Sequence, residues 1–287
     1  MTVRLATPAD LETVADVLEI SGESAAWPGL PGWPYLQHLL GRGRVAIALD
    51  SDGATSGMAG SIEVGRSDVR FLTDLFVRPD RQDLGLGRKL LDVVLEGATA
   101  RLTFSSADPR AIALYVRSGM RPWWPLFYVA LDRSVLADAG SDVGDRALRS
   151  EPTDPVTGAT WSMSWTGMDR STDFAHYEGL PDGAGSLVSV GQEVGAVVWS
   201  NRSRNDAWRV VDHVTIAPDV DPVPVTLAAL RAALDSAPGL AITIPGPHPA
   251  LGWLLDHGAR ITDRDQYCAT DPGLLDPERI LPSPGFL

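Results

Sequence analysis

The residues of this sequence with the clearest potential for chemistry form a glycine-containing turn, Gln82-Asp83-Leu84-Gly85-Leu86-Gly87-Arg88. An apolar run precedes this turn and apolar residues at helical spacing follow it, so we predict a strand, a turn and an amphipathic helix. Glycines at the start of a helix leave backbone N–H groups facing outward, with the positive end of the helix dipole behind them. Such a turn suits a diphosphate, although a plain tight turn has the same pattern.

Asp74, on the strand before the turn, is a candidate general base. Strict alternation along this strand places Leu72, Asp74 and Phe76 on one face. Burial of that face would raise the pKa of Asp74 toward the range of a base, while a structural hydrogen-bond acceptor is the alternative role. Glu63 and the carboxylate of the apolar tail, residues 281–287, are further candidates, although a chain end is commonly disordered. A water chain without a dedicated base would also serve, because positioning supplies much of the rate.

The elements that must position these residues alternate through the first half of the chain. Strands are predicted at 3–6, 44–49, 57–64, 71–77, 101–105 and 126–131, and helices at 7–20, 33–40, 88–95 and 109–118. This mixture predicts an α/β sandwich. Residues 136–158 are polar and rich in turn-forming residues, which indicates a linker.

The second half repeats the first with a constant offset. Val77-Arg78-Pro79-Asp80 recurs as Ile216-Ala217-Pro218-Asp219, and Gly119 recurs as Gly258, so both pairs are 139 residues apart (218 − 79 and 258 − 119). The offset predicts a strand at 208–218, a helix at 225–234, a strand at 240–244 and a helix at 249–256, after a hairpin of 185–190 with 193–200. We therefore predict two domains, 1–135 and 159–287, joined by the linker.

The repeat also acts as an internal control on the glycine turn. Under the same offset Gly85 becomes Pro224 and Gln82 becomes Asp221. Proline lacks an N–H and an aspartate repels phosphate, so the anion site is predicted only in the first domain.

Two motifs in the first half resemble those of the GNAT N-acetyltransferase superfamily. Gln82-x-x-Gly85-x-Gly87 resembles its coenzyme A signature, and Leu75-Phe76-Val77-x-Pro79 resembles the strand before that signature. The segment from Asp108 to Met120 is similar to the family's N-x-x-A-x-x-L-Y-x-x-x-G-F helix, with Asp in place of Asn and Met in place of Phe. The resemblance covers about residues 1–131.

The resemblance implies two tandem GNAT folds, each with a mixed central sheet flanked by helices, and a first domain that binds acetyl-CoA between splayed central strands. It implies that Tyr115 lies near the sulfur as general acid or hydrogen-bond donor, since a phenol with a reference pKa of about 10 holds its proton at neutral pH. The alternative is that Tyr115 is one more residue of the apolar face of its helix. The implied cofactor contacts are Leu75, Phe76, Val77, Gln82, Asp83, Leu84, Gly85, Leu86, Gly87, Arg88 and Asp108. The implied acceptor contacts are Trp27, Trp33 and Tyr35, for which core packing is the alternative.

The expected activity is transfer of an acetyl group from acetyl-CoA to a primary amine of a small molecule. One alternative is a non-catalytic acyl-CoA-binding sensor that contacts a partner through its second domain. The other is a tandem acetyltransferase similar to the synthase of mycothiol synthesis; there the catalytic half is the second, which argues against that alternative.

Composition narrows the partners. The chain of 287 residues carries 24 Lys and Arg against 37 Asp and Glu, a net charge of −13. This acidity disfavours nucleic acid and anionic membranes and favours a cationic amine, unless it serves solubility alone. The single cysteine, Cys268, excludes an intramolecular disulfide, and the five histidines show no metal-ligand spacing, so no metal is expected. Because the sequence has no membrane-length apolar run and no signal h-region, we expect a cytoplasmic protein. For its oligomeric state we expect a monomer or a homodimer.

Overall fold

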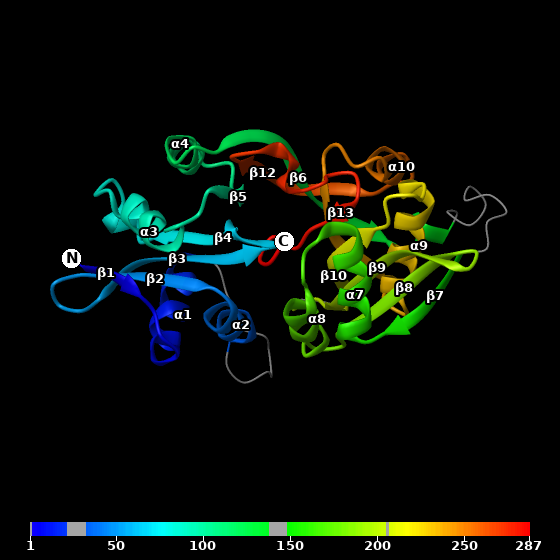
Figure 1. The fold of residues 1–287 in the computed structure, drawn as a ribbon, viewed down its shortest axis with the longest axis horizontal. Coiled ribbons are helices and arrows are strands. Elements are labelled where there is room, and N and C mark those ends of the chain that lie inside the picture. Colours follow the sequence, from blue (N-terminus) through cyan, green and yellow to red (C-terminus); the bar gives the residue numbers. More distant parts are fainter. Residues whose placement is uncertain (1, 22–32, 138–147, 205–206) are drawn as a thin grey trace. The chain divides into compact units, whose positions relative to one another are not determined.

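The computed structural model describes residues 2–21, 33–137, 148–204 and 207–287, which form a mixed series of helices and strands (Figure 1). The contacts within the chain divide it into two units. The first contains the described residues up to Pro122, together with Cys268–Asp271 and Phe286. The second contains the described residues of Trp123–Tyr267, Pro272–Gly285 and Leu287.

The first unit is a mixed sheet with helices packed on it. Its strands follow the order β1-β2-β3-β4-β5, antiparallel except for the parallel pair β4 and β5. Its elements are β1 (Thr2–Leu5), α1 (Leu11–Ile20), α2 (Pro34–Arg42), β2 (Arg44–Leu49), β3 (Thr55–Val64), β4 (Arg66–Val77), α3 (Leu86–Val94), β5 (Ala100–Ser105) and α4 (Pro109–Arg117).

The helix after the glycine turn forms because its apolar residues lie on one stripe. Leu86, Leu90, Leu91 and Val94 of α3 are buried in a core cluster that also contains Leu72 of β4. The polar residues between them, including Arg88 and Lys89, are exposed. This confirms the predicted order of strand, turn and amphipathic helix.

The second unit repeats this architecture. Its strands follow the order β12-β6-β11-β10-β9-β8-β7, and β13 pairs with β10. Its elements are β6 (Arg121–Asp132), α5 (Arg133–Ala137), β7 (Leu148–Thr153), α7 (Pro155–Thr166), α8 (Ser171–Glu178), β8 (Ala184–Val190), β9 (Glu193–Arg202), β10 (Arg209–Ile216), α9 (Pro222–Leu234), β11 (Gly239–Pro245), α10 (Ala250–Asp256), β12 (Arg260–Ala269) and β13 (Ile280–Leu281). The predicted repeat is present: β10, α9, β11 and α10 follow one another as β4, α3, β5 and α4 do.

The unit boundaries in the structure differ from those expected along the sequence. Strand β6 falls in the first sequence repeat, yet from Trp123 onward it groups with the second unit, where Leu126–Asp132 pair with β11. The expected linker, 136–158, contains β7 and the start of α7. The reason is that a strand joins whichever sheet offers it hydrogen-bond partners and an apolar face. A boundary drawn from the order of residues in the sequence contains no information about that choice.

The two central strands of the first unit separate part of the way along. The parallel pairing joins Val69–Leu72 of β4 to Ala100–Thr103 of β5, and β4 then continues to Val77. On its other edge, β4 stays paired with β3 through Val77. The expected splayed pair is therefore present.

A β-bulge interrupts β4 at Thr73. Gly60 of β3 pairs with Asp74, and the next residue of β3, Ser61, pairs with Leu72. Leu72, Leu75 and Val77 consequently share one core cluster. The predicted strict alternation, which put Leu72 on the same face as Asp74, is wrong, because the extra residue shifts every later side chain by one position.

Gly60 supplies a test of this packing. A Cβ at Gly60 would lie 2.6 Å from Thr73 Oγ1 and 2.8 Å from Leu39 Cδ2. We expect Gly60→Ala to lower the free energy of unfolding by about 1–3 kcal/mol, because overpacking displaces the bulge. The matched control is Gly41→Ala in α2, where a Cβ meets nothing within 4 Å and stability should be unchanged or slightly higher. Urea denaturation measures both, and equal stabilities for the two variants would contradict the packing described.

Candidate functional site

The glycine turn in the structure presents an open helix N-terminus. Asp83 and Gly85 have left-handed backbone, with φ of 62° and 73°, and Gly85 is the residue before the first turn of α3. No side chain caps this helix, so the N–H groups of residues 86–88 face outward without a side-chain acceptor. The side chains of residues 83–85 are exposed, while Leu86 is buried. The turn can therefore accept an anion at the positive end of α3.

Arg110 connects three of the residues expected at the cofactor site. Its Nη1 donates to Gln82 Oε1 at 2.7 Å, and its guanidinium pairs with the Asp108 carboxylate at 2.8 Å. Gln82 Nε2 in turn donates to the backbone O of Val77 at 3.2 Å. Sequence reasoning missed Arg110, because residues 82 and 110 are brought together only by the fold.

Asp108 has a structural role in the structure. It caps α4 by accepting a hydrogen bond from the backbone N of Arg110 at 2.8 Å. The Arg110 guanidinium, and then this backbone N–H, lower the pKa of the Asp108 carboxyl, so the cap is anionic at neutral pH. The expected contact of Asp108 with a cofactor stays a prediction.

Residues 75–77 run along the separated part of β4. Their backbone pairs with Gly57–Ala59 of β3 on one edge. Among the described residues, no strand pairs with them on the β5 edge, where the pairing ends at Leu72. This edge is where an extended chain could add hydrogen bonds, as expected for Leu75, Phe76 and Val77.

The bulge directs Asp74 toward α2. Asp74 Oδ2 accepts hydrogen bonds from the Tyr35 hydroxyl at 2.6 Å and from Thr73 Oγ1 at 2.7 Å. The structure thus brings together one residue predicted for the base and one predicted for the acceptor. Trp33, also predicted for the acceptor, is half-buried at the start of α2, and Trp27 lies outside the described residues.

Tyr115 lies in α4, on the side of the helix that packs against α3. It is 6% exposed and belongs to the same core cluster as the buried residues of α3. The close approach of the two helices is visible at Gly87, where a Cβ would lie 3.1 Å from Leu114 Cδ2. Glu63, the other candidate base, forms an ion pair with Arg70 at 2.5 Å, which indicates a structural role.

In the second unit the corresponding helix begins differently. Asp221, which corresponds to Gln82 under the offset of 139, caps α9 by accepting from the backbone N of Val223 at 3.1 Å. Helix α9 therefore starts three residues earlier than α3 and has a carboxylate at its N-terminus. Strand β10 has the same bulge as β4, at Asp212, followed by His213. Beside it, Ile280 and Leu281 of β13 pair with β10 on the edge that corresponds to the separated edge of β4.

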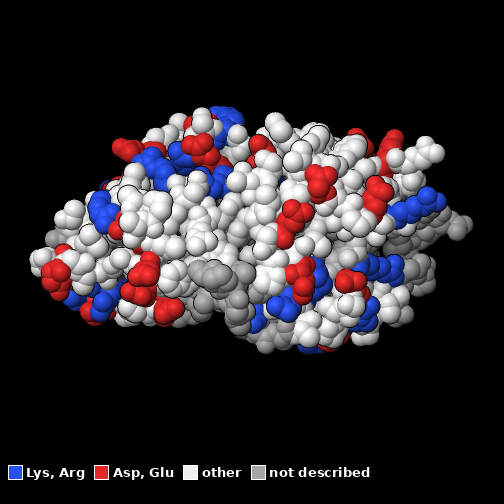
Figure 2. All heavy atoms as spheres, turned by 90° about the horizontal axis from the view of Figure 1, so that it is seen from below, with Lys and Arg blue, Asp and Glu red and all other residues white. Residues whose placement is uncertain are grey.

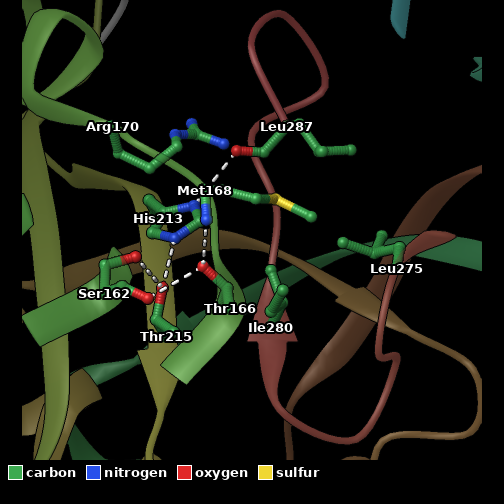
Figure 3. A pocket seen from close by; sticks show the side chains of 9 residues that line it. All are labelled: Ser162, Thr166, Met168, Arg170, His213, Thr215, Leu275, Ile280 and Leu287. Carbon is green, nitrogen blue, oxygen red and sulfur yellow. Dashed lines mark hydrogen bonds between the residues drawn. The ribbon is translucent and has the colours of Figure 1, made fainter. Parts of the chain in front are cut away.

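His213 and Leu287, the last residue of the sequence, line the same pocket (Figure 3). Leu287 is fully buried, and its O lies 3.0 Å from His213 Nδ1, while His213 Nε2 lies 2.6 Å from Thr215 Oγ1. The expectation that the chain end is disordered is therefore wrong: Leu281 and Leu287 pack in the second unit, and Phe286 groups with the first. The reason is that these apolar side chains are buried.

The hydrogen bonds around His213 have one consistent direction. Burial, and then the charge of Arg170, lower the pKa of His213 well below its ordinary value, so the ring is neutral and carries one N–H. Because Leu287 O can only accept, Nδ1 is the donor and Nε2 accepts from the Thr215 hydroxyl. Thr215 then accepts from Ser162, 3.1 Å away. His213 is thereby committed to structural hydrogen bonds.

Two other buried groups of the second unit have shifted pKa values. Burial raises the pKa of Asp212 to about 7, although Asn201 Nδ2 donates to both carboxylate oxygens at 2.7 Å. Burial lowers the pKa of His248 to about 4. In the first unit, Cys268 is buried, and this burial raises the pKa of its thiol to about 11.

The geometry first defines a class of protein: both units are α/β folds in which two parallel central strands diverge beside the N-terminus of a helix. This helix N-terminus has no side-chain cap in the first unit and is capped by Asp221 in the second. Comparison with known proteins then shows which family the chain resembles. Residues 14–120 match the acetyltransferase (GNAT) family. No curated protein sequence matches the chain.

Three solved structures illustrate the likeness of fold. A protein from Pyrococcus horikoshii, provisionally assigned as an acetyltransferase, is 13% identical with a TM-score of 0.69, over 100% of this chain and 95% of its own. A tandem GNAT protein from the clavulanic acid biosynthesis pathway is 15% identical with a TM-score of 0.61, over 94% and 99%. A GCN5-related N-acetyltransferase from Kribbella flavida is 17% identical with a TM-score of 0.59, over 93% and 70%.

Residues 14–120 are thus similar to the acetyltransferase (GNAT) family, and the chain as a whole shares the fold of a tandem GNAT protein. The resemblance and the fold class predicted from the two motifs and the repeat are confirmed.

The described residues lack both a membrane-spanning helix and a cluster of metal-binding side chains. None of their helices combines the length and apolar character needed to cross a bilayer. In the same part of the chain, no three His, Cys, Asp or Glu side chains gather in a way that could hold a metal ion.

The open N-terminus of α3 leads to a binding test. We expect isothermal titration calorimetry to show one coenzyme A per chain, and Arg88→Glu to weaken its affinity about tenfold, because an anion then faces the diphosphate. Arg88 is exposed, and an acidic residue in a first helical turn does not harm the helix. The control Arg117→Glu makes the same charge change at the exposed far end of α4 and should keep the affinity. Two sites per chain, or equal losses in both variants, would contradict the assignment.

The buried histidines predict a pH dependence of stability. Because His213 and His248 have lowered pKa values in the folded state, the unfolded chain binds more protons below pH 6.5, and stability falls as the pH drops. Asp212, with a raised pKa, acts in the opposite sense between about pH 4 and 7.

We expect His213→Asn to reduce the gain in unfolding free energy between pH 5 and 7.5, and Asp212→Asn to enlarge it, by up to about 1.4 kcal/mol per pH unit. Each variant is compared with itself by urea denaturation at the two pH values, so a uniform loss of stability cancels. Changes of the same sign in both variants would rule out this explanation.

Proposed function

We propose that the first unit transfers an acetyl group from acetyl-CoA to a primary amine of a small molecule, and that the second unit does not bind the cofactor. The observation that carries this proposal is the contrast between two corresponding helices. The N-terminus of α3 has no side-chain cap, whereas Asp221 closes that of α9. The family match over residues 14–120 supports acyl transfer in the unit with the open helix.

The residues of the first unit fit acetyl-CoA. The backbone N–H groups at the start of α3 would hold the diphosphate, with Asp83, Leu84 and Gly85 forming the turn. The separated edge of β4 at residues 75–77 would hold the pantetheine arm. Gln82, which Arg110 fixes, keeps the turn against the end of β4. When bound, acetyl-CoA supplies the acetyl group as a thioester.

Tyr115 is the group that we assign as general acid. A phenolic hydroxyl is a hydrogen-bond and proton donor, and Tyr115 Oη is the atom that would donate. Its helix lies directly against α3, whose N-terminus is the proposed diphosphate site.

We assign Asp74 as the carboxylate that binds the amine group of the acceptor. Hydroxyl groups of Tyr35 and Thr73 donate to its Oδ2, which stabilises the carboxylate charge and fixes its orientation. A fixed carboxylate attracts an ammonium group and can then hold its proton. These two hydrogen bonds agree with the structural role as well, so the activity of an Asp74 variant decides between the two.

The charge of the protein supports a small cationic acceptor. The net charge is −13, and on the face shown in Figure 2 the Lys and Arg side chains stand among Asp, Glu and uncharged residues. Such a surface does not favour a polyanion on this face.

A non-catalytic acyl-CoA sensor is the second candidate. The observation that favours it is the pairing of Asp74 with Tyr35 and Thr73, which is compatible with a purely structural carboxylate. A mycothiol-synthase-like enzyme is less well supported, because the helix start of the second unit is closed by Asp221.

Tyr115→Phe separates the enzyme from the sensor. With an amine panel and acetyl-CoA, we expect the wild-type protein to release free thiol, and the variant to lose about 10²- to 10⁴-fold in kcat, because a positioned acid contributes that much. Its coenzyme A affinity by calorimetry should be unchanged, since the ring that packs against α3 is retained. Coenzyme A binding without thiol release from the wild type, with every amine, would favour the sensor instead.

A further inference from the structure

In the first unit, the tyrosine that donates a hydrogen bond to Asp74 belongs to an aromatic cluster of Tyr35, His38 and Phe286. Tyr35, whose hydroxyl donates to Asp74 at 2.6 Å, has its ring 4.9 Å from that of Phe286. Phe286 also contacts His38, with ring centroids 4.7 Å apart and an edge-on angle of 88°. Phe286 groups with the first unit and is 2% exposed, so an almost fully buried ring packs against two aromatic side chains of α2.

The burial of Phe286 determines what it can do. A ring that is 2% exposed cannot form a large contact with a substrate, but it can restrict the rotamer of a neighbour. Tyr35 is only half-buried, and its hydroxyl must stay within hydrogen-bond distance to hold Asp74 Oδ2. An offset aromatic pair contributes about 0.5–1.5 kcal/mol beyond area burial, enough to bias the Tyr35 ring toward this one position.

We propose, on the basis of the function proposed above, that Phe286 is a positioning residue for the acceptor site: it holds the Tyr35 ring so that the Tyr35 hydroxyl orients the Asp74 carboxylate. Phe286 acts only through Tyr35. The order of action is therefore Phe286, Tyr35 and Asp74, and removal of the Tyr35 hydroxyl makes Phe286 irrelevant to the amine.

A double-mutant cycle tests this order. Phe286→Ala raises the KM for the amine about three- to tenfold, the factor that corresponds to the energy of one aromatic pair, and leaves the coenzyme A affinity unchanged. Tyr35→Phe, which keeps the ring and removes the hydroxyl, raises the same KM. The double variant is no worse than Tyr35→Phe alone, because both changes break one chain of contacts. Additive effects, or an unchanged KM in Phe286→Ala, overturn the proposal.

Conservative variants separate positioning from folding. Phe286→Tyr keeps the ring and retains the wild-type KM, while Phe286→Leu keeps an apolar side chain without the ring and raises it. The matched control is Phe104→Leu, which removes the ring that packs edge-on against Phe71 in the same unit. If Phe104→Leu raises the KM for the amine as much as Phe286→Leu, the effect is general loosening and the proposal fails.

A readout without activity distinguishes this proposal from the proposed function. With tyrosine labelled by ¹³C at Cζ, the Tyr35 resonance, assigned by its loss in Tyr35→Phe, reports the hydrogen bond of the hydroxyl. It shifts in Phe286→Leu and stays in place in Phe104→Leu. If the wild type acetylates no amine yet this pattern is seen, the proposed function fails and the positioning role stands. If the resonance is the same in all proteins, the positioning role fails whatever the activity.

Discussion

The separation of two parallel strands is the constraint on which both units depend. In the first unit, β4 and β5 pair only over Val69–Leu72 and Ala100–Thr103, and β4 continues beyond this pairing. A strand edge carries a row of N–H and C=O groups that need partners. In the second unit the corresponding edge of β10 is paired with Ile280 and Leu281 of the chain itself. Among the described residues, the same fold thus has a separated strand edge in one unit and a paired edge in the other.

The helix that follows each separated strand obeys the same logic. Its first N–H groups have no partner inside the helix, so either a side chain or a ligand must satisfy them. Asp221 does so for α9, while α3 begins with glycine and no cap. Asp221 also brings a negative charge to the place where a diphosphate would have to bind. Closure of the strand edge and closure of the helix therefore occur together in the second unit, and neither occurs among the described residues of the first.

Local patterns in the sequence predicted a large part of this fold. The spacing of Leu86, Leu90 and Val94 predicted α3, and the offset between Pro79 and Pro218 predicted the second unit. Both signals depend on neighbours in the sequence or on a repeat, which are visible without coordinates. The bulges at Thr73 and Asp212 were not predicted, although they lie at corresponding positions. A bulge is a shift in the pairing of a strand with its neighbour, here of β4 with β3 and of β10 with β9, and the residue types of β4 and β10 do not predict it.

The sequence by itself determined the resemblance to the GNAT family, the repeated order of elements and the location of the glycine turn, because each depends on residue types at fixed spacings. The tertiary structure alone decided which residues meet: Arg110 with Gln82, Tyr35 with Asp74, and Phe286 with Tyr35. It also decided that β6 joins the second unit's sheet and that Leu287 is seated beside His213. These are contacts between residues far apart along the chain. Their partners are selected by the geometry of packing and by the need to satisfy buried hydrogen-bonding groups, for which a linear pattern carries no signal.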